Sequence, residues 1–500
     1  GRSEVSTSPY YSVTTYTETD SSGTIIDTIE QPAGTPDFFG GVTEDPERRS
    51  VTQDFSKDDL NTYDSDAFTA ILTMDLGKGT TLTSVTDYRE YEKETYFDNE
   101  GQSYSMLNFF SQAENEQLSQ EIRLNGSTDG MRWTSGLYYL DYETNVDTGT
   151  FVDEFNVLGL PATWMQNTPD LETTSLSIFG QLEMDLSEQL TFIAGARVID
   201  EEKDYSHSVT WYDYNGNNNS PGNTSDVSAL YTLVGGYPTA EDDSSDTLWS
   251  GKLQLEWRPD DDMLVYSGLN RGIKAGSYNQ DLGGLGLFPA LSGGSPSYLG
   301  DAIPTSYDEE VLLAYEVGFK STMMDGNARL NGAVFYYDYQ DFQAFRYTGL
   351  SFYVTNQDAT STGVELDLVV SPMDGLDISL SAAYIDMEVE DVIFDAGPRD
   401  VAPPYAPEFQ ASGLVRYGWD ALGGRMAAQL NATYSDSFYS TATNFSSTEY
   451  PSYTLVDIRF SYTTSDGAWD VEVFGKNITD EFRKTVGFDL SGDFGFSQYA

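Results

Sequence analysis

The chain of 500 residues carries 25 Lys and Arg against 81 Asp and Glu, a formal net charge of -56, and no cysteine. This balance excludes nucleic acid as a partner, because phosphate binding needs cationic side chains. The missing cysteines exclude disulfides, thiolate chemistry and Cys-based zinc sites. The acidity fits a solvated surface in a salty habitat, or the binding of divalent cations by loop carboxylates.

The first 66 residues are rich in Ser, Thr, Asp, Gly and Pro and show little periodicity, so we expect a long surface loop there, with short hairpins as an option. Four pairs of strand-like segments follow, each joined by a short turn. The predicted pairs are 68–76 with 80–95, 115–125 with 131–145, 172–186 with 189–205, and 246–257 with 263–271.

The second half continues with four more pairs. They are 312–320 with 328–346, 354–370 with 376–389, 408–419 with a return to 438, and 453–463 with a return to 478. Apolar residues take every second position, as in Val364, Leu366 and Leu368, which is typical of a strand with one apolar face. Turns such as Asp374-Gly375 are strong hairpin signals, because Gly accepts a positive φ without steric strain.

Connections on the other side of these pairs are long: 148–171, 206–245, 272–308 and 391–407. Short turns on one side and long loops on the other are typical of an antiparallel transmembrane β-barrel. No apolar run approaches the ~20 residues of a spanning helix. We therefore predict an all-β fold, with residues 1–66 as an extracellular loop and 67–500 as the barrel. A soluble β protein with an aromatic core is the alternative.

Several motifs resemble those of TonB-dependent receptors. They are the stretch Asn270 to Asn279, Tyr315 to Lys320 followed by Met324-Asp325-Gly326, Thr362 to Asp367, and Phe474 to Glu481. They occur in the family's order and span about 68–481. The resemblance implies a barrel of about 22 strands around a plug, as in plugged outer-membrane transporters. About 16 strands are found here, so we expect the plug and the terminal strands to lie outside this chain.

The resemblance also implies active import across the outer membrane of a scarce, large solute: a siderophore, cobalamin or an oligosaccharide. Implied partners are outer-membrane lipid or lipopolysaccharide, and an inner-membrane TonB-type energy-coupling complex acting through the missing plug. An acidic vestibule favours neutral saccharides or cationic complexes, although salt screens charge beyond ~10 Å. A passive porin and a surface-exposed structural or adhesive barrel remain alternatives.

No catalytic constellation is found, so we do not expect an enzyme. The candidate ligand-binding residues are Trp164, Trp211, Tyr212, Tyr214 and Tyr278 in expected loops, and the basic Arg271 and Lys274 where a predicted strand runs into an outer loop. Loop packing is the alternative role for these rings. Asp213, Asn215 and Asn217 could form a structural Ca²⁺ site, although the spacing departs from an EF-hand and an Asn-Gly turn explains it as well. We expect no other cofactor, and we expect His207 to be solvated in a polar loop.

Overall fold

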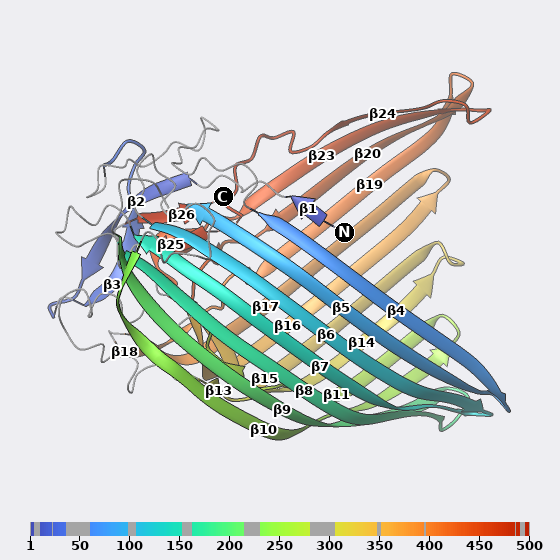
Figure 1. The fold of residues 1–500 in the computed structure, drawn as a ribbon. Coiled ribbons are helices and arrows are strands. Elements are labelled where there is room, and N and C mark those ends of the chain that lie inside the picture. Colours follow the sequence, from blue (N-terminus) through green and yellow to red (C-terminus); the bar gives the residue numbers. More distant parts are fainter. Residues whose placement is uncertain are drawn as a thin grey trace.

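The fold was analysed in a computed structural model. It describes residues 2–4, 11–22, 24–36, 61–98, 107–152, 163–214, 231–280, 306–347, 352–394, 397–485, 487–490 and 496–499. Its main element is one curved antiparallel sheet of 18 strands, of which β1 (Arg2–Glu4) and β18 (Gly397–Val401) are short. The other 16 strands, of 6 to 30 residues, form the wall of the molecule (Figure 1).

The wall follows chain order from β4 to β24. Its first eight strands are β4 (Thr62–Gly77), β5 (Thr80–Asp98), β6 (Leu107–Thr128), β7 (Met131–Val152), β8 (Thr163–Asp185), β9 (Leu190–Tyr214), β10 (Tyr231–Asp260) and β11 (Met263–Lys274). The second eight are β14 (Glu310–Met323), β15 (Ala328–Tyr347), β16 (Phe352–Met373), β17 (Leu376–Phe394), β19 (Phe409–Ala421), β20 (Gly424–Ser435), β23 (Tyr453–Thr464) and β24 (Asp470–Gly475). Among the described strands, registered pairs connect all neighbours in this order but do not join β24 back to β4.

All eight predicted hairpins are found at the predicted turns, but many strands are longer at the loop end than their apolar alternation indicated. The expected linker 206–245 is largely strand: β9 continues to Tyr214, and β10 begins at Tyr231. Likewise β7 continues to Val152 and β8 begins at Thr163. The apolar alternation is irregular in these extensions, because Ser, Thr, Asp and Gly residues interrupt it, so the pattern did not mark them as strand.

Side chains alternate between the two faces of the wall. On β10, Leu253, Leu255 and Trp257 point outward and are about half exposed, whereas Gln254 and Glu256 between them point inward. Ion pairs line the inner face, for example Arg258–Glu256 at 2.7 Å and Arg459–Glu472 at 3.1 Å. An apolar outer face with a polar inner face is what a barrel wall between lipid and an aqueous lumen requires.

Glycine is needed where the tight turns pack against the next hairpin. Gly375 has φ +80°, and a Cβ built on it would lie 2.1 Å from the carbonyl oxygen of Gly418. The Gly418 amide donates to the Gly375 carbonyl at 2.7 Å. The Asp-Gly signal therefore marks both the turn and the contact between neighbouring hairpins.

Short strands gather at the loop end of the wall. β2 (Tyr11–Thr19) pairs with β3 (Ile25–Glu30) and with β26 (Phe496–Tyr499), which pairs with β25 (Gly487–Leu490). The predicted 1–66 loop thus contains a hairpin, and β4 begins at Thr62, just before its expected end. No described residue belongs to a helix long and apolar enough to cross a membrane.

Candidate functional site at the mouth of the lumen

Residues 275–280, here called the strap, leave β11 and cross the inner face of the wall. They include β12 (Ser277–Tyr278), which pairs with β13 (Ser306–Tyr307). The Tyr278 ring stacks on Tyr205 of β9, with ring centroids 4.4 Å apart and planes 4° apart, and Leu171 of β8 completes this buried cluster. Burial raises the pKa of Tyr205, so its hydroxyl stays protonated and donates to the Asn279 carbonyl at 2.8 Å.

The strap is also bound to β15, through Ala275, and to β16, through Asn279. The Asn279 side chain donates to the Val354 carbonyl at 3.0 Å and accepts from the Val354 amide at 2.7 Å. The Gln343 side chain donates to the Ala275 carbonyl at 2.8 Å and to the Asp308 carbonyl at 3.1 Å. These hydrogen bonds satisfy buried polar groups along the strap and connect β8–β9 with β15–β16 through it.

His207 belongs to the anchor of the strap, so the expectation of a solvated loop residue is wrong. It lies on β9, is 8% exposed, and its ring Nε2 bonds to Oδ1 of Asn167 on β8. Asn167 donates in turn to Thr148 at 3.1 Å and to the Gln280 carbonyl at 2.6 Å. Burial lowers the pKa of His207 to about 4. The neutral ring therefore supports a hydrogen-bond network that holds the end of the strap.

The structure places three of the candidate ligand residues apart from one another. Tyr278 is buried against Tyr205 with 4% of its surface exposed, which is the loop-packing arrangement. Lys274 is exposed at the end of β11 and stands opposite Glu310. Arg271 lies on the outer face, with its guanidinium 4.2 Å from the centre of the Trp249 ring.

The other candidates stand in strands and not in loops, which corrects their expected setting. The backbone of β8 pairs with β9 so that Trp164 lies opposite Tyr212, and Trp211 lies opposite Met165. Tyr214 is the last residue of β9 and lies opposite Tyr231 of β10.

Asp213, in the predicted Ca²⁺ site, pairs with Thr163, whereas Asn215 and Asn217 lie outside the described residues. In the part of the chain that the structure describes, no three His, Asp or Glu side chains gather as a metal site. The Ca²⁺ site and the ligand-binding roles stay predictions.

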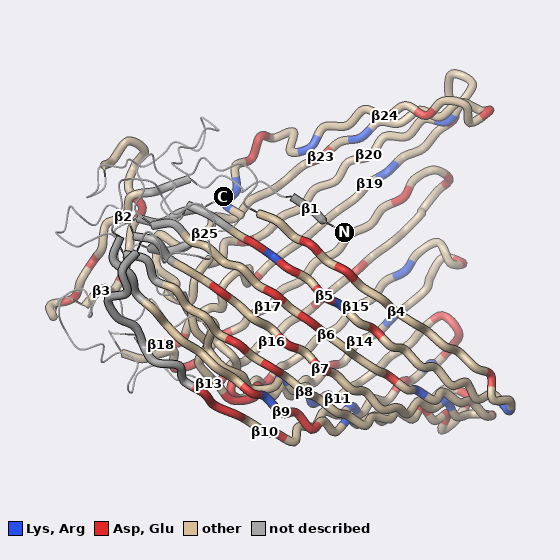
Figure 2. Tube along the Cα trace, in the orientation of Figure 1, with Lys and Arg blue, Asp and Glu red and all other residues tan. Residues whose placement is uncertain are grey.

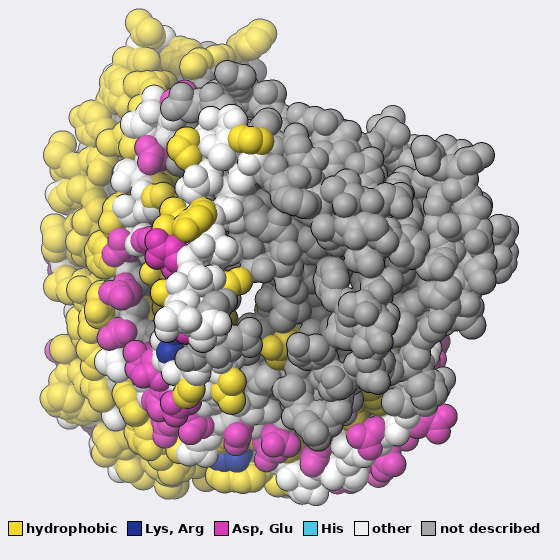
Figure 3. Space-filling view, turned by 90° about the vertical axis from the view of Figure 1, so that its left-hand side faces the viewer, with side chains coloured by type: hydrophobic (Ala, Val, Ile, Leu, Met, Phe, Trp, Pro, Cys, Tyr) yellow, Lys and Arg dark blue, Asp and Glu magenta, His cyan; other side chains and the backbone are white. Residues whose placement is uncertain are grey.

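Carboxylates form a continuous row on the outer face, just beyond the apolar band. The register places one acidic residue on each of seven neighbouring strands, β4 to β10, directly opposite the next. This acidic ladder consists of Asp66, Glu90, Glu116, Glu143, Glu172, Asp204 and Asp243. Red segments lie side by side on these strands in Figure 2, and Figure 3 shows acidic side chains along the rim of the loop end, next to the hydrophobic outer surface.

The ladder places seven carboxylates in one row. Glu143 adds to the effect of burial in raising the pKa of Asp170, which lies one row further toward the loop end. Sequence inspection missed the ladder because its members are far apart in the chain and only the strand register aligns them. The His207–Asn167 contact was missed for the same reason, since the two residues are 40 positions apart.

A wall of antiparallel strands that is apolar outside and charged inside is typical of transmembrane β-barrels. The family model described as "TonB dependent receptor-like, beta-barrel" matches residues 6–478. The chain belongs to the TonB-dependent receptor family, as its motifs indicated.

Solved structures share this fold at low sequence identity. The ferric yersiniabactin uptake receptor FyuA of Yersinia pestis is 16% identical, with a TM-score of 0.64 over 88% of this chain and 60% of its own. The siderophore receptor PiuA of Acinetobacter baumannii is 15% identical, with a TM-score of 0.62 over 88% of this chain and 64% of its own. The ferric-catecholate import receptor Fiu of E. coli K12 is 12% identical, with a TM-score of 0.57 over 94% and 70%. The chain therefore spans about three fifths of the length of the first two.

Proposed function

We propose that this protein forms the barrel of an active transporter in the outer membrane of a Gram-negative bacterium, and that it imports a scarce, large solute. The match of the receptor-barrel family over residues 6–478 carries this proposal. The two-faced wall supports it, because the outer face suits lipid and the inner face suits a polar lumen. A plug outside this chain would connect the lumen to a TonB-type complex.

The cargo class is inferred from charge. Siderophore, cobalamin and oligosaccharide all fit a transporter of this family, and the receptors similar in fold are named for ferric siderophores. The net charge of -56 and the acidic rim disfavour anionic chelates at long range. We propose neutral saccharides or cationic complexes as the first candidates for the imported solute.

Uptake by living cells tests the proposal. Cells with the full-length gene, cells with a deletion and cells without the TonB-type energy complex are compared for uptake of labelled candidate solutes at limiting concentration. We expect uptake only when both the gene and the energy complex are present. Uptake that persists without the complex would indicate a passive pore, and unchanged uptake after gene deletion would favour a structural or adhesive barrel.

A further inference from the structure

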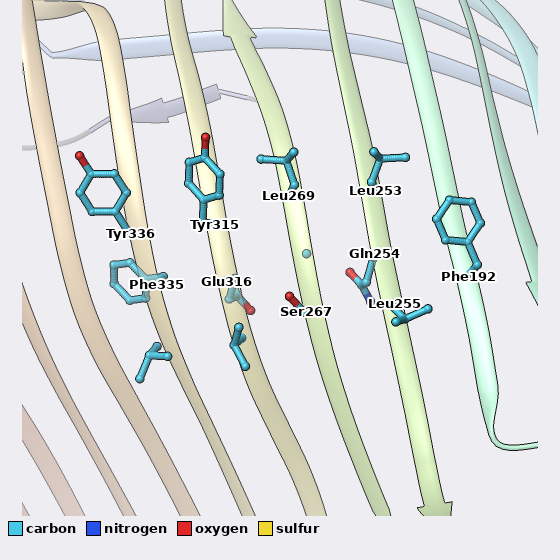
Figure 4. Close-up of a pocket in the computed structure, with 13 residues that line it drawn as sticks. Phe192, Leu253, Gln254, Leu255, Ser267, Leu269, Tyr315, Glu316, Phe335 and Tyr336 are labelled. Atoms are coloured by element: carbon cyan, nitrogen blue, oxygen red, sulfur yellow. The ribbon is translucent and has the colours of Figure 1, made fainter.

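The outer face of the wall carries a groove of about 710 Å³ that extends across β9, β10, β11, β14 and β15 (Figure 4). Outward-pointing apolar side chains line it, among them Phe192, Leu253, Leu255, Leu269, Val317 and Val334. Ser267 of β11 lies between Leu255 and Val317 in the register. Its small side chain leaves space where the neighbouring strands present branched apolar ones, so the wall has an apolar trough instead of a smooth surface.

Two tyrosines close the groove toward the loop end. Tyr315 and Tyr336 lie side by side, with ring centroids 6.3 Å apart, and their hydroxyls point along the strands toward the loops (Figure 4). They are 47% and 44% exposed. An apolar ring with a hydroxyl toward water is typical of the membrane–water interface. The groove therefore lies in the lipid-facing band, directly beneath the outer headgroup level.

A single cation lies above the groove on this face. Among the Lys and Arg residues whose side chains the structure describes on the 16 strands of the wall, Arg271 alone occupies an outward-facing position; the rest face the lumen. Arg271 is two residues beyond Leu269 on β11, and its partner on β14 is Leu313, two residues from Tyr315. Diagonal neighbours of this kind lie ~7–8 Å apart.

Arg271 has unused hydrogen-bonding capacity. One guanidinium nitrogen donates to the carbonyl of Trp249, and the plane covers the Trp249 ring. A guanidinium carries several further N–H donors in a fork that matches phosphate oxygens. Stacking on Trp249 holds this fork near the end of the groove, where the Tyr315 hydroxyl also lies.

We propose that the groove and Arg271 bind one acyl lipid of the outer leaflet whose phosphate-bearing headgroup carries a net negative charge. An acyl chain fills the trough over Ser267, and the phosphate accepts hydrogen bonds from Arg271 and the tyrosine hydroxyls. A lipid is the expected occupant because the groove is continuous with the lipid-facing band. An anionic headgroup is expected because Arg271 is positively charged. The acidic ladder on β4 to β10 repels anionic headgroups, so Arg271 offers them a favourable place. The inference requires a bilayer around the wall but no particular cargo.

Native mass spectrometry of the full-length protein tests the site. The protein in detergent is mixed with equal amounts of phosphatidylglycerol and phosphatidylcholine that have identical acyl chains, and it is then released from the detergent in the mass spectrometer. We expect one phosphatidylglycerol to be retained in preference to phosphatidylcholine. Arg271→Gln should lower this preference about fivefold, the effect of one basic residue near a membrane surface. Ser267→Leu should reduce retention of both lipids by filling the trough.

Two matched variants serve as controls. Arg416→Gln removes the same charge from the lumen side, where Arg416 makes a loose 3.8 Å pair with Asp377. Ser135→Leu fills an outward serine on β7, away from the groove. Both should retain the phosphatidylglycerol preference. Heat-modifiable mobility on gels confirms that each variant is folded, and Arg271→Lys should restore part of the preference if Arg271→Gln folds poorly.

Four results would overturn the inference. The first is equal retention of the two lipids by the unmodified protein, and the second is an unchanged preference in Arg271→Gln. The third is displacement of the lipid by inorganic phosphate alone. The fourth is the observation of protein dimers instead of a lipid adduct, with dimer formation blocked by Ser267→Leu. The third would indicate a site for free phosphate, and the fourth would assign the groove to a second copy of the chain.

Discussion

At the scale of single residues, His207 makes the anchoring of the strap sensitive to pH. It lies in the extension of β9, 17 residues beyond Leu190 at the turn, and so outside the segment that crosses the membrane. The folded protein favours the neutral ring, with a pKa of about 4 against 6.5 for a free histidine. Stability from this group is fully present above pH 6.5 and is lost as the pH falls toward 4.

We expect this anchor to weaken by up to roughly 3 kcal/mol between pH 6.5 and pH 4, the free energy that corresponds to the shift. Hydrogen exchange of the amides around Asn167 and His207, corrected for intrinsic rates, measures the opening. The variant His207→Gln keeps a donor for Asn167 but has no charge to gain, so its exchange should depend on pH less than that of the unmodified protein; the remainder comes from Asp147 and Asp170, whose pKa values burial raises. An equal pH dependence in both proteins would contradict the assignment.

Gly276 is required by the close approach of the strap to β13. A Cβ built on Gly276 would lie 2.5 Å from the backbone oxygen of Tyr307, which cannot move without the strand. Gly276→Ala should therefore displace the strap at a cost of about 1–3 kcal/mol. Limited proteolysis within 275–280 should become at least tenfold faster.

Gly268→Ala is the matched control, because the nearest heavy atoms to its Cβ are 3.7 Å away. This variant should be cut at the rate of the unmodified protein. Equal cleavage of both variants would show that the strap tolerates a side chain at Gly276.

At the scale of secondary-structure elements, the acidic ladder places like charges opposite each other across seven strands. Such pairs are destabilising, each by a few tenths of a kcal/mol up to about 1 kcal/mol. Glu143 lies between Glu116 and Glu172, so Glu143→Gln removes two repulsive contacts at once. We expect this variant to unfold at higher denaturant concentration than the unmodified protein in low salt, and the difference to vanish near 1 M salt, where the screening length is ~3 Å.

Glu365→Gln is the control for the ladder. Glu365 stands opposite Ala333 and Ala383, so it has no acidic cross-strand partner. Its removal should change the free energy of unfolding little at either salt concentration. A stabilisation as large as that of Glu143→Gln would mean that total charge, and not the register, determines the effect.

The strands and hairpins also show which parts of the fold could be predicted from the sequence. Alternation such as Val364, Leu366 and Leu368 is local, and a turn such as Asp374-Gly375 is local, so the eight hairpins were predictable. The strand ends were not, because apolar residues such as Tyr205 and Val209 are interrupted by Ser206, His207 and Ser208, so the apolar alternation is too irregular to mark a strand. Contacts across long separations, such as Tyr278 on Tyr205, depend on the register and on the path of the strap.

At the scale of the whole molecule, one face of the wall suits lipid and the other suits the lumen. Successive residues of each strand point to opposite faces, so neighbouring positions differ in what they contact. Leu380 points outward and is 46% exposed, whereas the hydroxyl of the adjacent Ser381 donates to Asp367 on the inner face. Leu380→Arg should destabilise the folded protein in lipid vesicles by about 2–4 kcal/mol, the cost near the bilayer midplane. Ser381→Arg should cost much less, because it can pair with Asp367.

Denaturant titration in vesicles measures both variants. Comparable destabilisation by the two substitutions would argue against a bilayer on the Leu380 side. Detergent-free solubility of the full-length protein as a monodisperse monomer would contradict the membrane-spanning fold itself.

The strap has a mechanical consequence. It ties β8–β9 to β15–β16 through hydrogen bonds of neutral groups, such as Tyr205 to Asn279 and Asn279 to Val354. Added salt does not weaken hydrogen bonds between neutral groups in this way. It does screen the repulsion along the acidic ladder, which lies on the outer face of β4 to β10 and shares β8 and β9 with the strap. A change in salinity would therefore alter the repulsion on the outside of β4 to β10, while the hydrogen bonds of the strap would keep β9 and β16 at the same separation.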